Sequence, residues 1–119
     1  MSKRGAEIGA QGETLVASYL VAQGATIVAR NWRIKEGEID LVARLNGTLL
    51  FVEVKSRTSE KFGHPLEAID KEKAHRLQRL ALAWIATHES WGAEFRIDCA
   101  AVHLGDRLNP TIDYRAGVL

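Results

Sequence analysis

An acidic residue interrupts each of the two apolar stretches in the segment GEIDLVARLNGTLLFVEVK, which covers residues 37–55. Asp40 lies in the first stretch, Glu53 lies in the second, and Lys55 follows two positions later. Two carboxylates can bind a divalent cation, and an ammonium group beside them can assist the hydrolysis of a phosphate ester. They can act together only if the fold brings them to one surface.

The dipeptide Asn46-Gly47, between the two stretches, is typical of a two-residue type I′ turn. Such a turn fixes the register of its strands, because the residues that flank it face each other. Counting outward from the turn predicts one wholly apolar face, expected to be core, with the pairs Leu45 with Thr48, Ala43 with Leu50, Leu41 with Val52 and Ile39 with Val54.

The opposite face of this hairpin carries the charged residues. The same count places Asp40 opposite Glu53, in a non-hydrogen-bonded pair whose Cα atoms are typically about 4.5 Å apart. Glu38 falls opposite Lys55, and a cross-strand ion pair is the simplest interpretation. Opposed carboxylates repel, so they require screening by solvent, a proton on one of them, or a divalent cation between them.

A cation between these carboxylates would be Mg²⁺ or Mn²⁺, because both metals prefer hard oxygen ligands and keep positions for water or phosphate. A phosphodiester is then the natural substrate. Lys55 projects on the same face, where its ammonium group could orient the attacking water or neutralise charge that develops on the phosphate. The spacing thus predicts Asp40 and Glu53 as metal ligands.

The flanking segments predict the elements that position these residues. Apolar side chains at helical spacing indicate an amphipathic helix over residues 6–23, which Gly24 ends. Gly9 and Gly12 lie inside this helix and suggest either close packing or a frayed first turn. Residues 25–33, rich in β-branched side chains, indicate a strand.

After the hairpin, turn-forming and basic residues indicate a loop over residues 56–65. A second helix is expected from about residue 70 to residue 88, and residues 93–104 indicate a strand. The tail from Gly105 carries no clear pattern. The order of helix, three strands, helix and strand predicts a single α/β domain over residues 1–119, with a mixed sheet flanked by helices.

Composition limits the function classes. The chain has 119 residues and a net charge of +1, so affinity for nucleic acid would have to come from local clusters of Lys and Arg. The single cysteine, Cys99, excludes a disulfide framework and is expected to be a buried thiol in a reducing cytoplasm. No apolar run approaches the roughly 18 residues of a membrane span, and the N-terminus lacks the apolar segment of a signal peptide.

Asp40, followed by Glu53-Val54-Lys55, resembles the PD-(D/E)XK signature of restriction-endonuclease-like nucleases, with Ile39 in place of the proline. The longer patterns GEIDL, FVEVKSR and GxxGExxxxxYL (residues 9–20) are similar to those of the YraN-type family, also designated UPF0102. These small bacterial proteins are regarded as endonucleases related to archaeal Holliday-junction resolvases. The resemblance covers most of the chain.

The resemblance implies a restriction-endonuclease-like fold, with a central mixed β-sheet flanked by α-helices. It also implies Asp40 and Glu53 as metal ligands, Lys55 as the catalytic lysine and Glu13 as the acidic residue of the first helix. A homodimer follows from the family resemblance alone.

Basic residues in the segments that lead into and out of the site are candidates for a phosphate track: Arg30, Arg33, Arg57, Lys61, Lys71, Lys73, Arg76 and Arg79. We assign nucleic-acid binding to Arg30, Arg33, Arg57 and Lys61, whereas the helix residues could equally form a solvated face. Two functions stay open. One is a Mg²⁺- or Mn²⁺-dependent endonuclease acting on DNA, branched or structured DNA included, and the other is a non-catalytic nucleic-acid-binding module on a nuclease fold.

Overall fold

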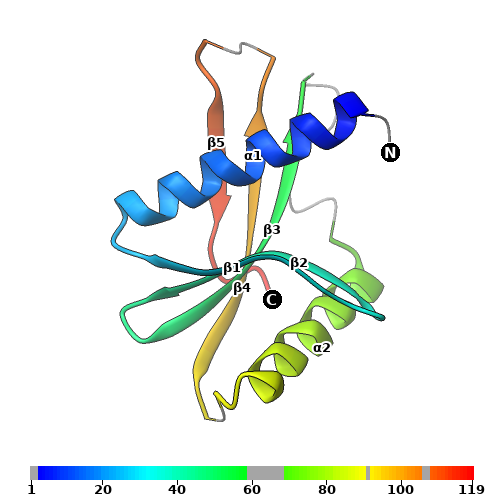
Figure 1. Ribbon diagram of the computed structural model, residues 1–119, viewed down its shortest axis with the longest axis vertical. Helices are drawn as coiled ribbons and strands as arrows, with labels where there is room; N and C mark the ends of the chain where they lie inside the picture. The colour runs from blue at the N-terminus through cyan, green and yellow to red at the C-terminus, as the bar shows by residue number, and fades with distance from the viewer. Residues whose placement is uncertain (1–2, 59–68, 91, 106–107) are drawn as a thin grey trace.

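The computed structural model describes residues 3–58, 69–90, 92–105 and 108–119 (Figure 1). Its elements are α1 (Lys3–Ala22), β1 (Thr26–Ile34), β2 (Gly37–Leu45), β3 (Thr48–Arg57), α2 (Lys71–Thr87), β4 (Glu94–His103) and β5 (Thr111–Arg115). Neither of these helices is long and apolar enough to cross a membrane, within the part of the chain that the structure describes.

The strands form one five-stranded sheet in the order β1-β2-β3-β4-β5. Neighbouring strands are antiparallel except β3 and β4, which are parallel and are joined through α2. The expected α/β class, with a mixed sheet flanked by helices, is therefore confirmed. Two details of the prediction were wrong: β5 had not been assigned, and β3 continues to Arg57 where a loop was expected from residue 56.

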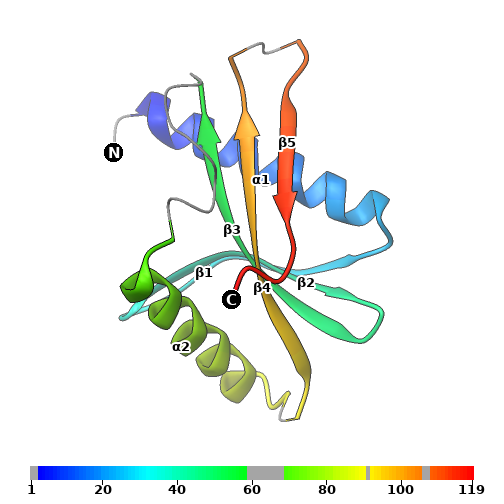
Figure 2. The same cartoon turned by 180° about the vertical axis from the view of Figure 1, so that it is seen from behind.

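The helices cover opposite faces of the sheet. Figure 1 shows α1 in front of β3, β4 and β5, and Figure 2 shows the same strands in front of α1. The core on the α1 side includes Val16, Leu20, Leu41, Leu50, Val52 and Val102. The core on the α2 side includes Ile39, Val42, Phe51, Leu77, Leu80 and Trp84. Both faces of the β2–β3 hairpin are thus buried, whereas only one had been predicted as core.

The Asn46-Gly47 turn and the glycine that ends α1 are as the sequence predicted, and the N-cap of α2 is a further signal that had not been assigned. Asn46 and Gly47 have φ angles of 51° and 83°, and a positive φ at both positions is the requirement of a type I′ turn. The side chain of Asp70 caps α2 by accepting a hydrogen bond of 2.8 Å from the backbone N–H of Lys73. Gly24, two residues beyond the end of α1, has a φ of +99°.

Gly12 is buried where α1 crosses β3. A Cβ atom at this position would lie 1.8 Å from Ser56 Oγ and 3.1 Å from Ser56 Cβ. Close packing, rather than a frayed first turn, therefore explains this glycine. Because α1 approaches the strand so closely, the neighbouring residue Glu13 is brought to the sheet as well.

Candidate functional site

The predicted register of the hairpin holds for the half of it nearest the turn. Leu45 pairs with Thr48, Ala43 with Leu50, and Leu41 with Val52. Beyond Leu41 the ladder ends, because β2 stays paired with β1 as far as Gly37 whereas β3 stays paired with β4 as far as Arg57. The two strands diverge at this point, as Figures 1 and 2 both show.

This divergence contradicts the prediction that Asp40 and Glu53 form a ladder pair. Instead, Asp40 Oδ2 accepts a hydrogen bond of 2.8 Å from the backbone N–H of Val54. The carboxylate thus takes the place of the main-chain acceptor that a continuing strand would supply. Ile39, which had been paired with Val54, packs in the core on the α2 side.

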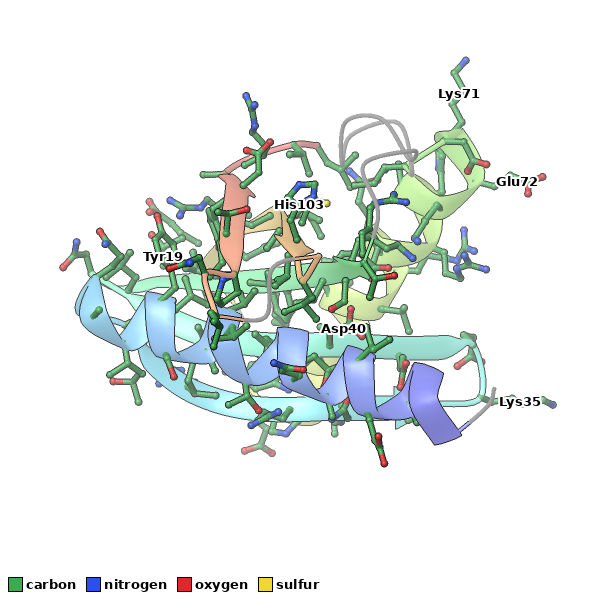
Figure 3. All side chains as sticks on the ribbon, turned by 90° about the horizontal axis from the view of Figure 1, so that it is seen from above. Tyr19, Lys35, Asp40, Lys71, Glu72 and His103 are labelled. Atoms are coloured by element: carbon green, nitrogen blue, oxygen red, sulfur yellow. The ribbon has the colours of Figure 1, made fainter. Side chains whose placement is uncertain are left out.

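The two carboxylates nevertheless face one pocket. Asp40 is 8% exposed and Glu53 is 9% exposed. They line a pocket of about 190 Å³, which we call the carboxylate pocket, together with Gly37, Glu38, Lys73, Arg76, Leu77 and Leu80. Figure 3 shows Asp40 between the ribbons of α1 and α2. We call the place where β2 and β3 diverge, beyond the pair Leu41 and Val52, the fork. Groups from both helices reach the carboxylates there.

The electrostatics of Asp40 reflect this crowding of acids. Burial raises the pKa of Asp40 to about 7, and repulsion from Glu53 contributes in the same direction. The carboxylates of Glu13 and Glu38 add smaller increases, whereas the hydrogen bond from Val54 lowers this pKa. A divalent cation beside Asp40 would favour its charged form and so reverse the shift.

Two lysines form ion pairs with the same oxygen of Glu53. Lys73 Nζ lies 2.9 Å from Glu53 Oε1, and Lys55 Nζ lies 3.3 Å from it. Burial lowers the pKa of Lys55, and contact with Lys73 lowers it further. Burial also acts to lower the pKa of Lys73, but its interactions with Lys55 and Glu53 outweigh this effect and raise it.

Sequence reasoning had not assigned Lys73 to the site. It had been one of the candidates for a phosphate track, among the basic helix residues that could equally form a solvated face. The available signal was its position one helical turn before Leu77, at the end of the helix nearest the predicted catalytic strand. Placing it at Glu53 required knowledge of how α2 packs on the sheet.

Glu13 reaches the site from α1. A second pocket, of about 410 Å³, is lined by Glu13 and Lys55 together with Gly5, Ile8, Gly9, Val54, Ser56, Arg57 and Thr58. Glu13 Oε1 lies 4.0 Å from Arg30 Nη2. The Glu13 carboxylate is also close enough to Asp40 to raise the pKa of that carboxyl group. The structure therefore gathers all four residues of the predicted catalytic set around the fork.

Two of the residues predicted to bind nucleic acid, Arg30 and Arg33, form ion pairs with acidic side chains of the protein. Arg30 pairs with Glu13 and donates a hydrogen bond of 3.1 Å to Thr14 Oγ1. Arg33 pairs with Glu38 at 2.7 Å, which corrects the expectation that Glu38 pairs with Lys55.

Arg57 is half-buried and lines the pocket that holds Lys55. Lys61 lies outside the described residues. Contact of Arg30, Arg33, Arg57 or Lys61 with nucleic acid stays a prediction.

Asp40 and Glu53 are the residues best placed to hold a divalent cation. Among the described residues, no group of three or more His, Cys, Asp and Glu side chains is arranged to hold a metal. A cation here would therefore take its remaining ligands from water or phosphate, which is how Mg²⁺ commonly binds. The all-oxygen donor pair fits Mg²⁺ or Mn²⁺.

Comparison with known proteins places the chain in a family. A model described as "Uncharacterised protein family UPF0102" matches residues 12–102. A UPF0102 protein of Beutenbergia cavernae is 53% identical over 95 residues, which cover 80% of each chain. A UPF0102 protein of Leifsonia xyli subsp. xyli is 42% identical over 113 residues, which cover 95% of this chain and 96% of that protein.

A UPF0102 protein of Mycolicibacterium smegmatis is 42% identical over 115 residues, which cover 95% of this chain and 93% of that protein. The names of these relatives state no activity. The extent of these matches shows that the chain belongs to the uncharacterised family UPF0102, as its GEIDL and FVEVKSR motifs predicted.

Proposed function

We propose that this protein is a metal-dependent endonuclease that hydrolyses phosphodiester bonds in DNA, with branched or structured DNA among its substrates. The observation that carries the proposal is the pair of buried carboxylates, Asp40 and Glu53, in one pocket with basic side chains of α2. Burying two like charges side by side costs free energy, so a ligand that needs both of them is a reason for the arrangement. A divalent cation is such a ligand.

The residues of the fork have distinct tasks in this proposal. Asp40 and Glu53 would hold Mg²⁺ or Mn²⁺, which when bound polarises the phosphoryl group and lowers the pKa of the attacking water. Lys55, held by Glu53 at 3.3 Å, orients that water and stabilises negative charge on the phosphate. Leu77 and Leu80 form an apolar wall of the pocket, which strengthens these electrostatic interactions.

The test is single-turnover cleavage of a panel of linear, flapped and branched DNAs with Mg²⁺ or Mn²⁺. We expect the wild type to cut at least one of them, and Asp40→Asn to lose cleavage while it still binds the same DNA. Asp113→Asn is the matched control, because Asp113 forms an ion pair of 2.9 Å with Arg115 on β5. Its cleavage rate should equal that of the wild type.

Two outcomes contradict the proposal. Cleavage by Asp40→Asn at the wild-type rate would show that another site does the chemistry. Binding of DNA in Ca²⁺, with no cleavage of any substrate in Mg²⁺ or Mn²⁺, would favour the alternative of a non-catalytic binding module.

A further inference from the structure

The carboxylate of Glu53 already has a cationic partner from α2. Lys73 Nζ lies 2.9 Å from Glu53 Oε1, closer than Lys55 Nζ at 3.3 Å. The side chain of Lys73 is 18% exposed, whereas that of Lys55 is 34% exposed. The shorter and more buried ion pair of Glu53 is therefore the one that joins β3 to α2, through Lys73.

The position of Lys73 is fixed by the start of α2. Its backbone N–H is bound by the capping side chain of Asp70, and Leu77, one turn later, is buried against the sheet. From this position the Lys73 side chain lines the carboxylate pocket, with Asp40, Glu53 and Arg76. Lys55 lines the second pocket, on the side of Glu13. The two lysines thus approach Glu53 from different pockets.

We propose that Lys73 is a built-in counterion of Glu53 that the divalent cation displaces, and that the displaced ammonium group then binds a phosphate oxygen of the DNA. This inference rests on the proposed function. A divalent cation on Glu53 would place a second positive charge beside the Lys73 ammonium group, which lies 2.9 Å from Glu53 Oε1. Repulsion between the two cations favours departure of the lysine. The flexible four-carbon stem of lysine allows its charge to move without a rearrangement of the helix.

Charge balance gives the displaced lysine a new partner. Before the cation binds, Lys73 compensates one of two buried carboxylates. A divalent cation neutralises both, and Glu38, the third carboxylate of the pocket, is paired with Arg33. Lys73 and Arg76 therefore become excess positive charge in the same pocket. A phosphate group bound to the cation supplies the negative charge that these two side chains then lack.

The first test measures Mn²⁺ affinity without DNA, by calorimetric titration of the wild type, Lys73→Met and Lys71→Met. Lys71 makes a matched control, because it is exposed on the same helical turn and Figure 3 shows it projecting away from Asp40. Loss of the competing ion pair should make Lys73→Met bind Mn²⁺ about fivefold more tightly, which corresponds to about 1 kcal/mol. Lys71→Met should stay within about twofold of the wild type.

Unchanged or weaker Mn²⁺ binding by a folded Lys73→Met variant would overturn the counterion assignment. Lys73→Gln provides a second variant that removes the charge and keeps a polar end, in case the methionine variant does not fold. Urea unfolding of each variant reports the stability that the ion pair contributes.

The second test measures the affinity for a cleavable DNA with and without Ca²⁺, at a Ca²⁺ concentration that saturates every variant. The ratio of the two dissociation constants gives the coupling between cation and DNA. Lys73→Met should show a coupling at least about threefold smaller than the wild type, because it has no ammonium group to release. Lys71→Met should keep the wild-type ratio, and an equal ratio for Lys73→Met would overturn the phosphate contact.

These results separate the inference from the proposed function. If the wild type cuts DNA and Lys73→Met binds Mn²⁺ with wild-type affinity, the counterion is wrong and the nuclease stands. If Lys73→Met binds Mn²⁺ more tightly but the wild type cuts no DNA, the counterion stands and the nuclease is wrong. If neither protein binds Mn²⁺, both are wrong.

Discussion

Two buried aspartates in this sheet have opposite surroundings. Asp98, on β4, is fully buried and accepts hydrogen bonds from Arg96 Nε at 3.0 Å, from the Tyr114 hydroxyl group and from the backbone N–H of Gly117 at 2.8 Å. Asp40, on β2, is 8% exposed and accepts one hydrogen bond from the described residues, that of Val54. The charged groups that raise its pKa are the carboxylates of Glu53, Glu13 and Glu38.

The difference between them is the one we expect between an acid that holds the fold together and an acid that binds a ligand. The Asp98 cluster joins β4, β5 and the tail after β5, and the hydrogen bond from Arg96 to the Asp98 carboxylate raises the pKa of Arg96. Burial and the bond to Asp98 likewise raise the pKa of Tyr114. Asp98 is surrounded by hydrogen-bond donors, whereas burial and Glu53 both raise the pKa of Asp40. An acid that the fold destabilises is the better candidate for a ligand-binding site.

The largest difference between the two regions is expected in the rate of DNA cleavage. It should appear when the basic residue near each aspartate is removed, Lys55 near Asp40 and Arg96 beside Asp98. Lys55→Ala should lower the single-turnover rate by about 10²- to 10⁴-fold without weakening metal binding, because an ammonium group assists the chemistry but is no metal ligand. Arg96→Ala should cut at a rate near that of the wild type but unfold more easily. A Lys55→Ala variant that cuts at the wild-type rate would refute the role given to Lys55.

The next contrast is in stability, measured by urea unfolding at neutral pH without metal. Asp98→Ala should lose about 3 to 5 kcal/mol of unfolding free energy, because it leaves the donors of Arg96, Tyr114 and Gly117 without their acceptor. Asp40→Asn should be as stable as the wild type or more stable, because it removes a repelled charge and keeps an acceptor for Val54. Equal losses in both variants would remove the distinction between the two aspartates.

The pH dependence of stability should follow Asp40. The pKa of Asp40 is about 7 in the folded protein against 3.8 for an aspartate in water, so between these values the folded state holds a proton that the unfolded state has released. The free energy of unfolding should therefore fall as pH rises from about 4 to about 7, by roughly 2 to 4 kcal/mol in total, and level off above that. Urea unfolding across this range should show that Asp40→Asn removes the decline. A decline of the same size in that variant would assign it to other groups.

The smallest expected effect is stabilisation by metal. Mn²⁺ should raise the unfolding free energy of the wild type by about 1 to 3 kcal/mol at 10 to 100 times its dissociation constant, because it binds only the folded arrangement. Thermal unfolding should show no such rise for the double variant Asp40→Asn, Glu53→Gln. Asp98→Asn should keep it, even from a lower starting midpoint. An equal rise in the double variant would place the metal elsewhere.

Sequence reasoning could predict the parts of the site that local signals control. Asn46-Gly47 determined the register as far as Leu41 with Val52, and an apolar stripe at helical spacing located α2 to within a residue at each end. The residue types at Asp40, Glu53 and Lys55 suggest the proposed chemistry, which stays a prediction, and the loss of their exact pairing does not remove that suggestion.

The remaining features depend on how distant elements compete. The fork at Asp40 arises because β2 stays paired with β1 while β3 stays paired with β4. The alternation of residues within the hairpin does not indicate this competition between neighbouring strands. The position of Lys73 beside Glu53 depends on how α2 packs against the sheet. The strand β5 is five residues long, too short for alternation to distinguish it from a loop. Asp98 had a signal, a charge within an apolar run, but its partners Tyr114 and Gly117 lie in the unassigned tail.

The contact between Gly12 and Ser56 has a consequence for mutational tolerance. Alanine at position 12 would require the Ser56 hydroxyl group to rotate and its Cβ to give way by a few tenths of an ångström, and any longer side chain would have to part the helix from the strand. A saturation library at position 12 should therefore tolerate little beyond glycine, although glycine brings no reactive group. Glu13 is the next residue, so this intolerance would fix the depth at which its carboxylate enters the fork. Pairing the library with Ser56→Gly should widen the accepted set first to alanine and serine.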